Sequence, residues 1–462
     1  LPRLLPAGAP ERPEPLRRWE LLLALPVGFL GGLALLAWFS RFYLPGWTSA
    51  DFQAYCMSVA SLREGGLGNW YILRSVGAGL LPAFFAKFFG VLDGLALGAV
   101  VSSMGLVAGL YLWGVAIRGW RLGLATVFFV GTVGPLALVP RLLSFYPEVV
   151  AGLVLGSVLP VLAWRLGSLK GLFWGSVGVA ICLLVDARGL LWALPGLLLL
   201  GATAWRLPAG RGPKAAAMLI PLILAWFLGK FFYGPTLPLE GQTALMLKTN
   251  GVIVDAGHSG YTGFRWGYSN PLRIPQTFYI LARQAQVTVP QGDFQQRLRE
   301  TQVDPWLPLL GLSSVLALLG LRQAWRERLP MLLPALPFAL AFFSAARMEP
   351  AERFLAVGLP FLPLLLALAW QTVGGGEGRR GWISLGLLLL LVTGIVPSWL
   401  SPASSWRVPF LAMPEAQRSA RAALGWSSAG QRPDADCLRA LQGDVTAGRL
   451  PGVLVPVGSE NQ

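Results

Sequence analysis

The chain has 462 residues, of which 55% are hydrophobic and only 13% are charged, and its mean hydropathy is +0.59. A typical soluble protein has about 25% charged residues, so the composition argues against a cytosolic enzyme, a nucleic-acid-binding protein and a disordered protein. The net charge of +15 is typical, in a membrane protein, of Lys and Arg gathered in cytoplasmic loops. We therefore expect an all-α, polytopic integral membrane protein.

Apolar blocks of the length that crosses a bilayer recur along the chain. The stretch 75–91 is also apolar, but it is short and contains Pro82 and Lys87. We interpret it as an interfacial or re-entrant helix in the first outside loop. The blocks predict about eleven transmembrane helices, at 20–40, 94–117, 122–140, 148–164, 171–186, 189–205, 215–233, 306–321, 329–346, 354–371 and 382–399.

The distribution of Lys and Arg predicts the orientation of these spans. With the N-terminus inside, every short cytoplasmic segment contains at least two positive charges, as the positive-inside rule requires. The first apolar run is too long for a cleavable signal peptide and lacks an A-x-A site. The Arg-rich composition suggests a bacterial inner membrane. The predicted organisation is a cytoplasmic segment 1–19, a transmembrane domain 20–399 with outside loops 41–93 and 234–305, and an extracytoplasmic tail 400–462.

Several chemistries have no signature in the sequence. There is no P-loop, no HExxH and no GxSxG, and the single histidine, His258, excludes a multi-histidine metal site. Cys56, Cys182 and Cys437 have no metal-binding spacing. We expect Cys182 in the core, whereas Cys56 and Cys437 fall on the same predicted side and could form a disulfide.

Polar and mostly charged residues gather at the predicted outside turns. An ionised group at bilayer depth costs about 2.5–3.5 kcal/mol even on lenient scales. Charged residues at the ends of spans are therefore at the membrane interface, paired with an opposite charge, or part of a functional site. Each one alone fits snorkelling or a local pair, such as Asp186 with Arg188. Together they offer a general base and cations for a leaving phosphate. The set comprises Asp51, Arg141, Tyr146, Glu148, Asp186, Arg188, Arg347, Glu349, Glu352 and Arg353.

Four segments carry a family resemblance. They are Asp51 with the following AYCMSVASLREGG (54–66), RSVGAGLLPAFFAKFFG (74–90), FYPEVVAGLVL (145–155) and RMEPAERFLAVGLPFLPLLLALA (347–369). In their order and in the number of spans they resemble the GT-C membrane glycosyltransferases, in particular members similar to protein O-mannosyltransferases and aminoarabinose transferases. The resemblance is good over 20–205, patchy over 347–371 and undetectable in 234–305 and the tail.

The resemblance implies a GT-C-like fold and an inverting sugar transfer on the extracytoplasmic face. The donor would be a polyprenyl-phosphate-linked sugar, and the acceptor a glycan, a lipid or a protein. Asp51 matches the family's catalytic base, Glu148 its second acidic position, and Arg347 or Arg353 its late arginine that contacts the lipid phosphate. We add Arg188, Tyr146 and Arg141 as candidate phosphate contacts. Asp51 is followed by Phe52 rather than by a second acid, and no DxD motif is present. A divalent metal is therefore not supported, and we expect no required cofactor and no nucleic-acid partner.

Two alternatives remain open at this point. A transporter or flippase of lipid-linked or anionic substrates would place charges inside spans and show an internal repeat, neither of which is evident. A non-catalytic scaffold subunit would use the 234–305 loop and the tail to bind partner proteins. Substrate access from one side of the membrane favours an enzyme, whereas alternating access favours a transporter.

Overall fold

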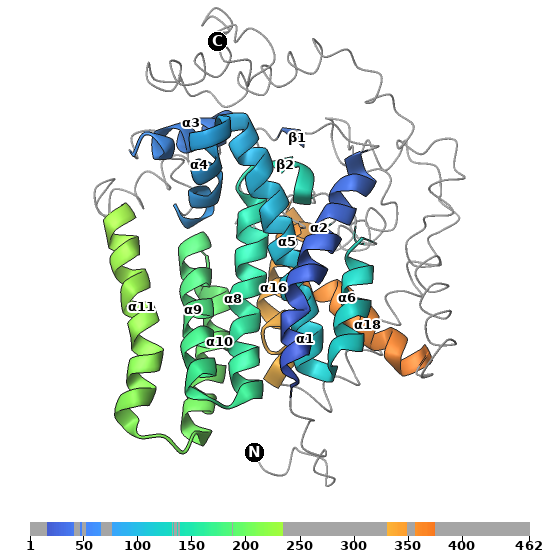
Figure 1. The fold of residues 1–462 in the computed structure, drawn as a ribbon, viewed down its shortest axis with the longest axis vertical. Coiled ribbons are helices and arrows are strands. Elements are labelled where there is room, and N and C mark those ends of the chain that lie inside the picture. Colours follow the sequence, from blue (N-terminus) through green and yellow to red (C-terminus); the bar gives the residue numbers. More distant parts are fainter. Residues whose placement is uncertain are drawn as a thin grey trace, which may run out of the picture.

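The computed structural model describes residues 16–40, 47–48, 52–65, 76–131, 133, 136, 139–186, 188–233, 330–348 and 356–374. These form a bundle of helices that run mostly along one axis (Figure 1). The predicted spans 306–321 and 382–399, the 234–305 loop and the tail with Cys437 lie outside the described residues. In chain order the elements are α1 (Arg18–Leu22), α2 (Ala24–Ser40), β1 (Trp47–Thr48), α3 (Phe52–Arg63), α4 (Gly77–Phe89), α5 (Val91–Arg118), α6 (Trp120–Val130), the 3-10 helix η2 (Val139–Arg141), β2 (Leu142–Leu143), α8 (Tyr146–Leu166), α9 (Leu169–Val185), α10 (Leu190–Arg206), α11 (Arg211–Tyr233), α16 (Ala335–Met348) and α18 (Phe361–Gly374).

The described helices confirm a polytopic α-helical membrane protein. Four stretches are long and apolar enough to cross a bilayer: Arg18–Leu36, Asp93–Arg118, Tyr146–Leu166 and Arg211–Leu228. Shorter apolar helices lie beside them, among them Leu169–Val185 and Leu190–Arg206. The total of eleven spans stays a prediction. Besides the helices, the described residues contain one very small sheet, the parallel pair β1–β2.

Among the described helices, α4 and α6 fall well short of the length of a spanning helix. The apolar run 122–140 predicts a full span, but α6 has 11 residues and so extends about 16 Å, roughly half of a 30 Å hydrocarbon core. Its sequence explains the early end, because Gly131, Gly134 and Pro135 interrupt a helix. The stretch 75–91 forms α4, whose 13 residues are likewise too few to span.

Glycines let neighbouring helices approach closely. A Cβ atom placed on Gly114 of α5 would lie 2.7 Å from the Cα of Gly123 on α6. On α8, a Cβ at Gly156 would lie 2.5 Å from the Sγ of Cys182 and 2.7 Å from the carbonyl oxygen of Gly178, both on α9. Such approaches exclude any side chain, and small residues at helix contacts are typical of membrane bundles. Cys182 is buried, as predicted.

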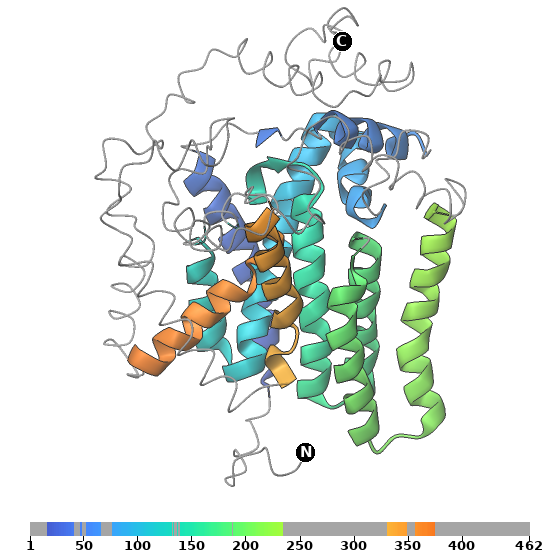
Figure 2. The same cartoon turned by 180° about the vertical axis from the view of Figure 1, so that it is seen from behind.

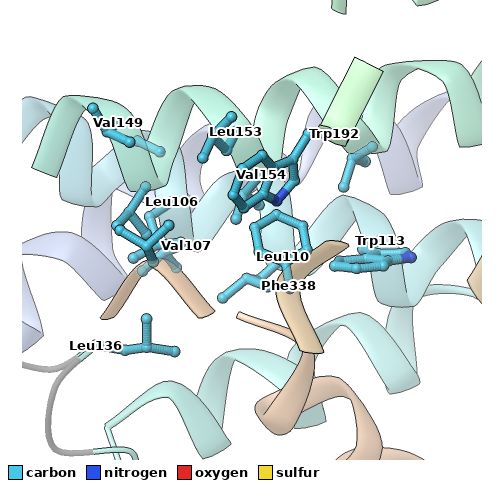
Figure 3. Close-up of a cluster of buried hydrophobic side chains, with 14 of the residues drawn as sticks. Leu106, Val107, Leu110, Trp113, Leu136, Val149, Leu153, Val154, Trp192 and Phe338 are labelled. Carbon is cyan, nitrogen blue, oxygen red and sulfur yellow. The ribbon is translucent and has the colours of Figure 1, made fainter. Parts of the chain in front are cut away.

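The core lies between α5 and α8 and reaches across to α16. Phe338 of α16 packs between two tryptophans, with ring centroids 5.9 Å from Trp113 and 5.8 Å from Trp192 (Figure 3). The indole Nε1 of Trp113 donates a hydrogen bond of 2.9 Å to the carbonyl oxygen of Met331. These contacts attach the late segment of the chain to the N-terminal helices. Seen from behind, α16 and α18 cover one side of the bundle, and α11 stands at its edge (Figure 2).

The two ends of the bundle differ in charge. The start of α1 and the turns α5–α6, α8–α9 and α10–α11 lie at one end. We call it the basic end, because most of its charged residues are Lys or Arg. We call the other the mixed end, where α3, α4 and the starts of α5 and α8 lie (Figure 1). Which end faces the cytoplasm stays a prediction. The described charged residues of the basic end are Arg17, Arg18, Arg118, Arg121, Arg165, Lys170, Arg206, Arg211 and Lys214, with Glu20 as the acidic one, and those of the mixed end are Arg63, Glu64, Lys87, Asp93, Glu148, Asp186 and Arg188.

Candidate functional site

A two-residue sheet brings two distant helix starts together at the mixed end. Strands β1 and β2 pair in parallel, with Trp47 opposite Leu142 and Thr48 opposite Leu143. Three residues past Thr48 the chain reaches Asp51, directly before α3, and three residues past Leu143 it reaches Tyr146, the first residue of α8. The pairing therefore aligns the starts of α3 and α8. Asp51 itself lies outside the described residues.

Aromatic packing holds the same two helix starts against each other. The rings of Tyr55 on α3 and Phe145, the residue before α8, have centroids 4.7 Å apart and are fully buried. The local sequence also favours a helix start here. Pro147 stands in the first turn of α8, where its missing N–H costs nothing. The backbone N–H of Tyr146 donates a 3.3 Å hydrogen bond to the Oγ of Ser144.

Glu148 in the first turn of α8 is the most unusual side chain at this end. It is 6% exposed, and among the described residues neither of its carboxylate oxygens has a hydrogen-bond partner. A Cβ atom on Gly98 of α5 would lie 2.7 Å from Oε1 of Glu148 and 2.9 Å from Cγ of Pro82 on α4, so the carboxyl is enclosed by α4 and α5. The side chain of Ser102 on α5 is buried close to this carboxyl, but its distance and angle to the carboxylate oxygens are not those of a hydrogen bond. Burial of an unpaired carboxyl costs several kcal/mol, which makes it a marker of function rather than of stability.

Asp186 and Arg188 form a local pair at the end of α9. The carboxylate of Asp186 is 3% exposed and accepts three hydrogen bonds from Arg188, from the backbone N at 2.7 Å and from Nε and Nη2 at 3.0 Å each. The pair fixes the direction of the Arg188 side chain, which remains half exposed. Its outer edge is therefore available to a second anion.

Helix α4 connects the two acidic positions. Its first residue, Gly77, packs against the backbone of Leu184, two residues before Asp186. One and a half turns later, Pro82 packs against Gly94 and Gly98 of α5, beside Glu148. The site at the mixed end is therefore built from α3, α4, α5, the start of α8 and the α9–α10 turn.

The structure describes the predicted site residues unequally. Glu148, Tyr146 and Arg188 are described in full, with Tyr146 buried. Arg141 ends η2 and Arg347 lies in the last turn of α16, and only their backbones are described. Arg353, like Asp51, lies outside the described residues. No group of three His, Cys, Asp or Glu that could hold a metal ion occurs within the described ranges, and the metal requirement stays untested.

Sequence reasoning did not select several residues that shape the site. They are Tyr55, Pro82, Gly98 and Ser102. Tyr55 and Pro82 lie inside segments that carry the family resemblance, which was the available signal. For Gly98 and Ser102 no pattern distinguishes them from other small residues of α5, because their importance comes from facing Glu148 across a helix contact.

Comparison with known proteins gives matches of structure only. No known family profile matches the sequence, and no curated protein matches it. ArnT from Cupriavidus metallidurans, solved with undecaprenyl phosphate, has a TM-score of 0.48 and 14% identity, over 93% of this chain and 78% of ArnT. The archaeal oligosaccharyltransferase AglB from Archaeoglobus fulgidus, in complex with an inhibitory peptide and a dolichol-phosphate, has a TM-score of 0.41 and 13% identity, over 96% of this chain and 61% of AglB. The A. fulgidus oligosaccharyltransferase tethered with an acceptor peptide has a TM-score of 0.44 and 10% identity, over 90% of this chain and 60% of the enzyme. At these identities and TM-scores a function for this protein has to be inferred from the residues of the site.

Proposed function

We propose that this protein is a GT-C-type membrane glycosyltransferase that moves a sugar from a polyprenyl-phosphate donor to an acceptor hydroxyl at the mixed end. One observation carries the proposal. On one side of Asp51, strand β1 pairs with β2, which leads into α8, and on the other side Tyr55 of α3 packs against Phe145, directly before α8. In the first turn of α8, Glu148 is buried without a hydrogen-bond partner among the described residues. We infer that Asp51, which directly precedes α3 in the sequence, serves the same site as Glu148.

The reaction would be a single displacement at the anomeric carbon. The acceptor oxygen forms the new glycosidic bond while the bond from the anomeric carbon to the phosphate oxygen breaks, and polyprenyl phosphate leaves with the bonding electrons. Asp51 accepts the acceptor's proton, a role that contributes about 10²- to 10⁴-fold in rate. Inversion follows from the single displacement. Because phosphate is already a good leaving group, no metal is required for this step.

Cations at the mixed end would neutralise the leaving phosphate. Arg188 is suited to this because Asp186 fixes its guanidinium and leaves an exposed edge, and guanidinium–phosphate contacts are strong and directional. Arg347, Arg353, Arg141 and Tyr146 are the further contacts that we propose. Glu148 would accept a hydrogen bond from a sugar or acceptor hydroxyl, which would satisfy its buried oxygens only when substrate is bound.

The decisive experiment replaces Asp51→Asn in the full-length protein reconstituted in vesicles with a panel of polyprenyl-phosphate sugars. We expect release of polyprenyl phosphate to fall by about 10²-fold or more, with insertion and thermal midpoint unchanged. Glu64→Gln is the matched control, because it makes the same chemical change on an exposed side chain just beyond α3. Undiminished transfer by the Asp51→Asn protein would disprove the assignment of the base.

A further inference from the structure

One corner of the basic end is built from chain segments that contain Lys and Arg but no acidic residue. It is formed by the ends of α8 and α10 and the starts of α9 and α11, which short turns connect. No Asp or Glu occurs in 149–185 or in 188–233. Within these described segments the corner carries positive charges alone, on Arg165, Lys170, Arg206, Arg211 and Lys214.

Arg206 is held in a defined position within this corner. Its guanidinium carbon Cζ lies 3.7 Å from the ring centroid of Trp164, which is in the last turn of α8. This is the geometry of a cation–π stack. Among the described residues it has no hydrogen-bond acceptor and no ion pair. Stacking orients the plane of the guanidinium and leaves its N–H edges free for an anion.

Exposed apolar side chains lie on the same helix as this cation. Trp205, next to Arg206 in the sequence, is 90% exposed, and Leu198, about two turns earlier on α10, is 66% exposed. Tryptophan concentrates at the level of the lipid headgroups, where one part of the ring contacts hydrocarbon and the other contacts water. A free aqueous anion would use the cations but not these apolar groups, whereas a phospholipid uses both.

We propose that this corner binds an anionic phospholipid, with its headgroup phosphate on Arg206 and its acyl chains along Trp205 and Leu198. A planar guanidinium matches two phosphate oxygens at once, and the surrounding Lys and Arg favour a lipid with net negative charge over a zwitterionic one. The site is separate from the one at the mixed end, and it does not depend on the proposed glycosyl transfer.

The test measures lipid retention by the full-length protein in detergent micelles, by native mass spectrometry with added phosphatidylglycerol or phosphatidylcholine. We expect phosphatidylglycerol to be retained preferentially. In the Arg206→Gln protein its apparent affinity should fall about fivefold, the factor expected for one cation near an anionic headgroup. The matched control is Arg121→Gln, which removes an equal charge at the same end, from an arginine that lies 5.6 Å from the Trp120 ring. This control should bind as the wild type does.

A second variant separates positioning from charge. Trp164→Leu keeps the charge of Arg206 but removes the ring on which it stacks, and we expect about a twofold loss. Equal losses in Arg206→Gln and Arg121→Gln would overturn the proposal in favour of a diffuse field. Equal retention of phosphatidylcholine would also overturn it, as would complete displacement by millimolar glycerol phosphate, which would indicate a site for free phosphate.

Discussion

Two buried glutamates, one at each end of the bundle, differ in whether their carboxylates have hydrogen-bond partners. At the basic end, Glu20 is 8% exposed, and its carboxylate accepts hydrogen bonds from the backbone N–H groups of Arg17 at 3.0 Å and Trp120 at 3.3 Å. It thereby caps the starts of both α1 and α6. At the mixed end, Glu148 is equally buried but unpaired among the described residues. Burial of a carboxyl is therefore compatible with a structural role, and the missing partner distinguishes the candidate site.

Among the variants that test this comparison, Glu148→Gln should have the largest effect. The amide keeps the size of the side chain but removes the charge that strengthens its hydrogen bond to substrate, a contribution of about 1.5–3 kcal/mol. Sugar transfer should therefore fall by about 10- to 100-fold, while the thermal midpoint stays the same or rises. Turnover and thermal unfolding of the purified protein in detergent check this. A variant that loses stability but retains wild-type turnover would give Glu148 the structural role of Glu20.

Filling the space beside Glu148 should have the next largest effect. The new methyl group of Gly98→Ala would press on the carboxyl of Glu148 and on Pro82, and overpacking of this kind costs about 1–3 kcal/mol. Activity should fall with stability. Gly201→Ala on α10 is the control, since no described residue outside the local turns of its own helix lies within 4 Å of the added Cβ. It should be neutral or slightly stabilising, and a similar loss in both variants would contradict the crowding at Glu148.

Glu20→Gln tests the other half of the comparison. Loss of a charged cap at two helix starts should lower the free energy of unfolding by about 1–2 kcal/mol, with transfer per folded molecule unchanged. Unfolding curves and specific activity measured on the same sample separate the two quantities. A fall in specific activity without a fall in stability would show that the two glutamates do not differ in the way proposed.

The smallest effect is expected from Tyr111→Phe. The Tyr111 hydroxyl is fully buried on α5 and has no hydrogen-bond partner among the described residues, but it lies away from the mixed end. Its removal should leave activity intact and change stability by less than about 1 kcal/mol, in the stabilising direction. Impaired transfer in this variant would mean that unpaired polar groups mark the function of the bundle at both ends.

Much of the fold follows from apolar length and from the placement of Arg and Lys, because the bilayer imposes both. The spans at 94–117, 148–164 and 171–186 appear as α5, α8 and α9. The predicted span 122–140 is longer than the helix α6. Hydropathy indicates that a segment is apolar, but it does not indicate that the segment is one continuous helix. Gly131, at which α6 ends, indicates this end, but it lies inside an apolar run. Burial of Glu148 could be anticipated from its position, but its enclosure by Pro82 and Gly98 could not. That enclosure depends on how α4 folds back on α5, which no spacing in the sequence encodes.

The pairing of β1 with β2 also has a consequence for how the protein is made. Strand β1 follows α2, and its partner β2 becomes available only after α3 to α6 have been synthesised. A parallel pair of two residues is too weak to form alone, so it must wait until the helices on both sides have been inserted and packed. A chain interrupted before α8 would therefore occupy the membrane without the candidate site at the mixed end, because that site needs both helix starts in place.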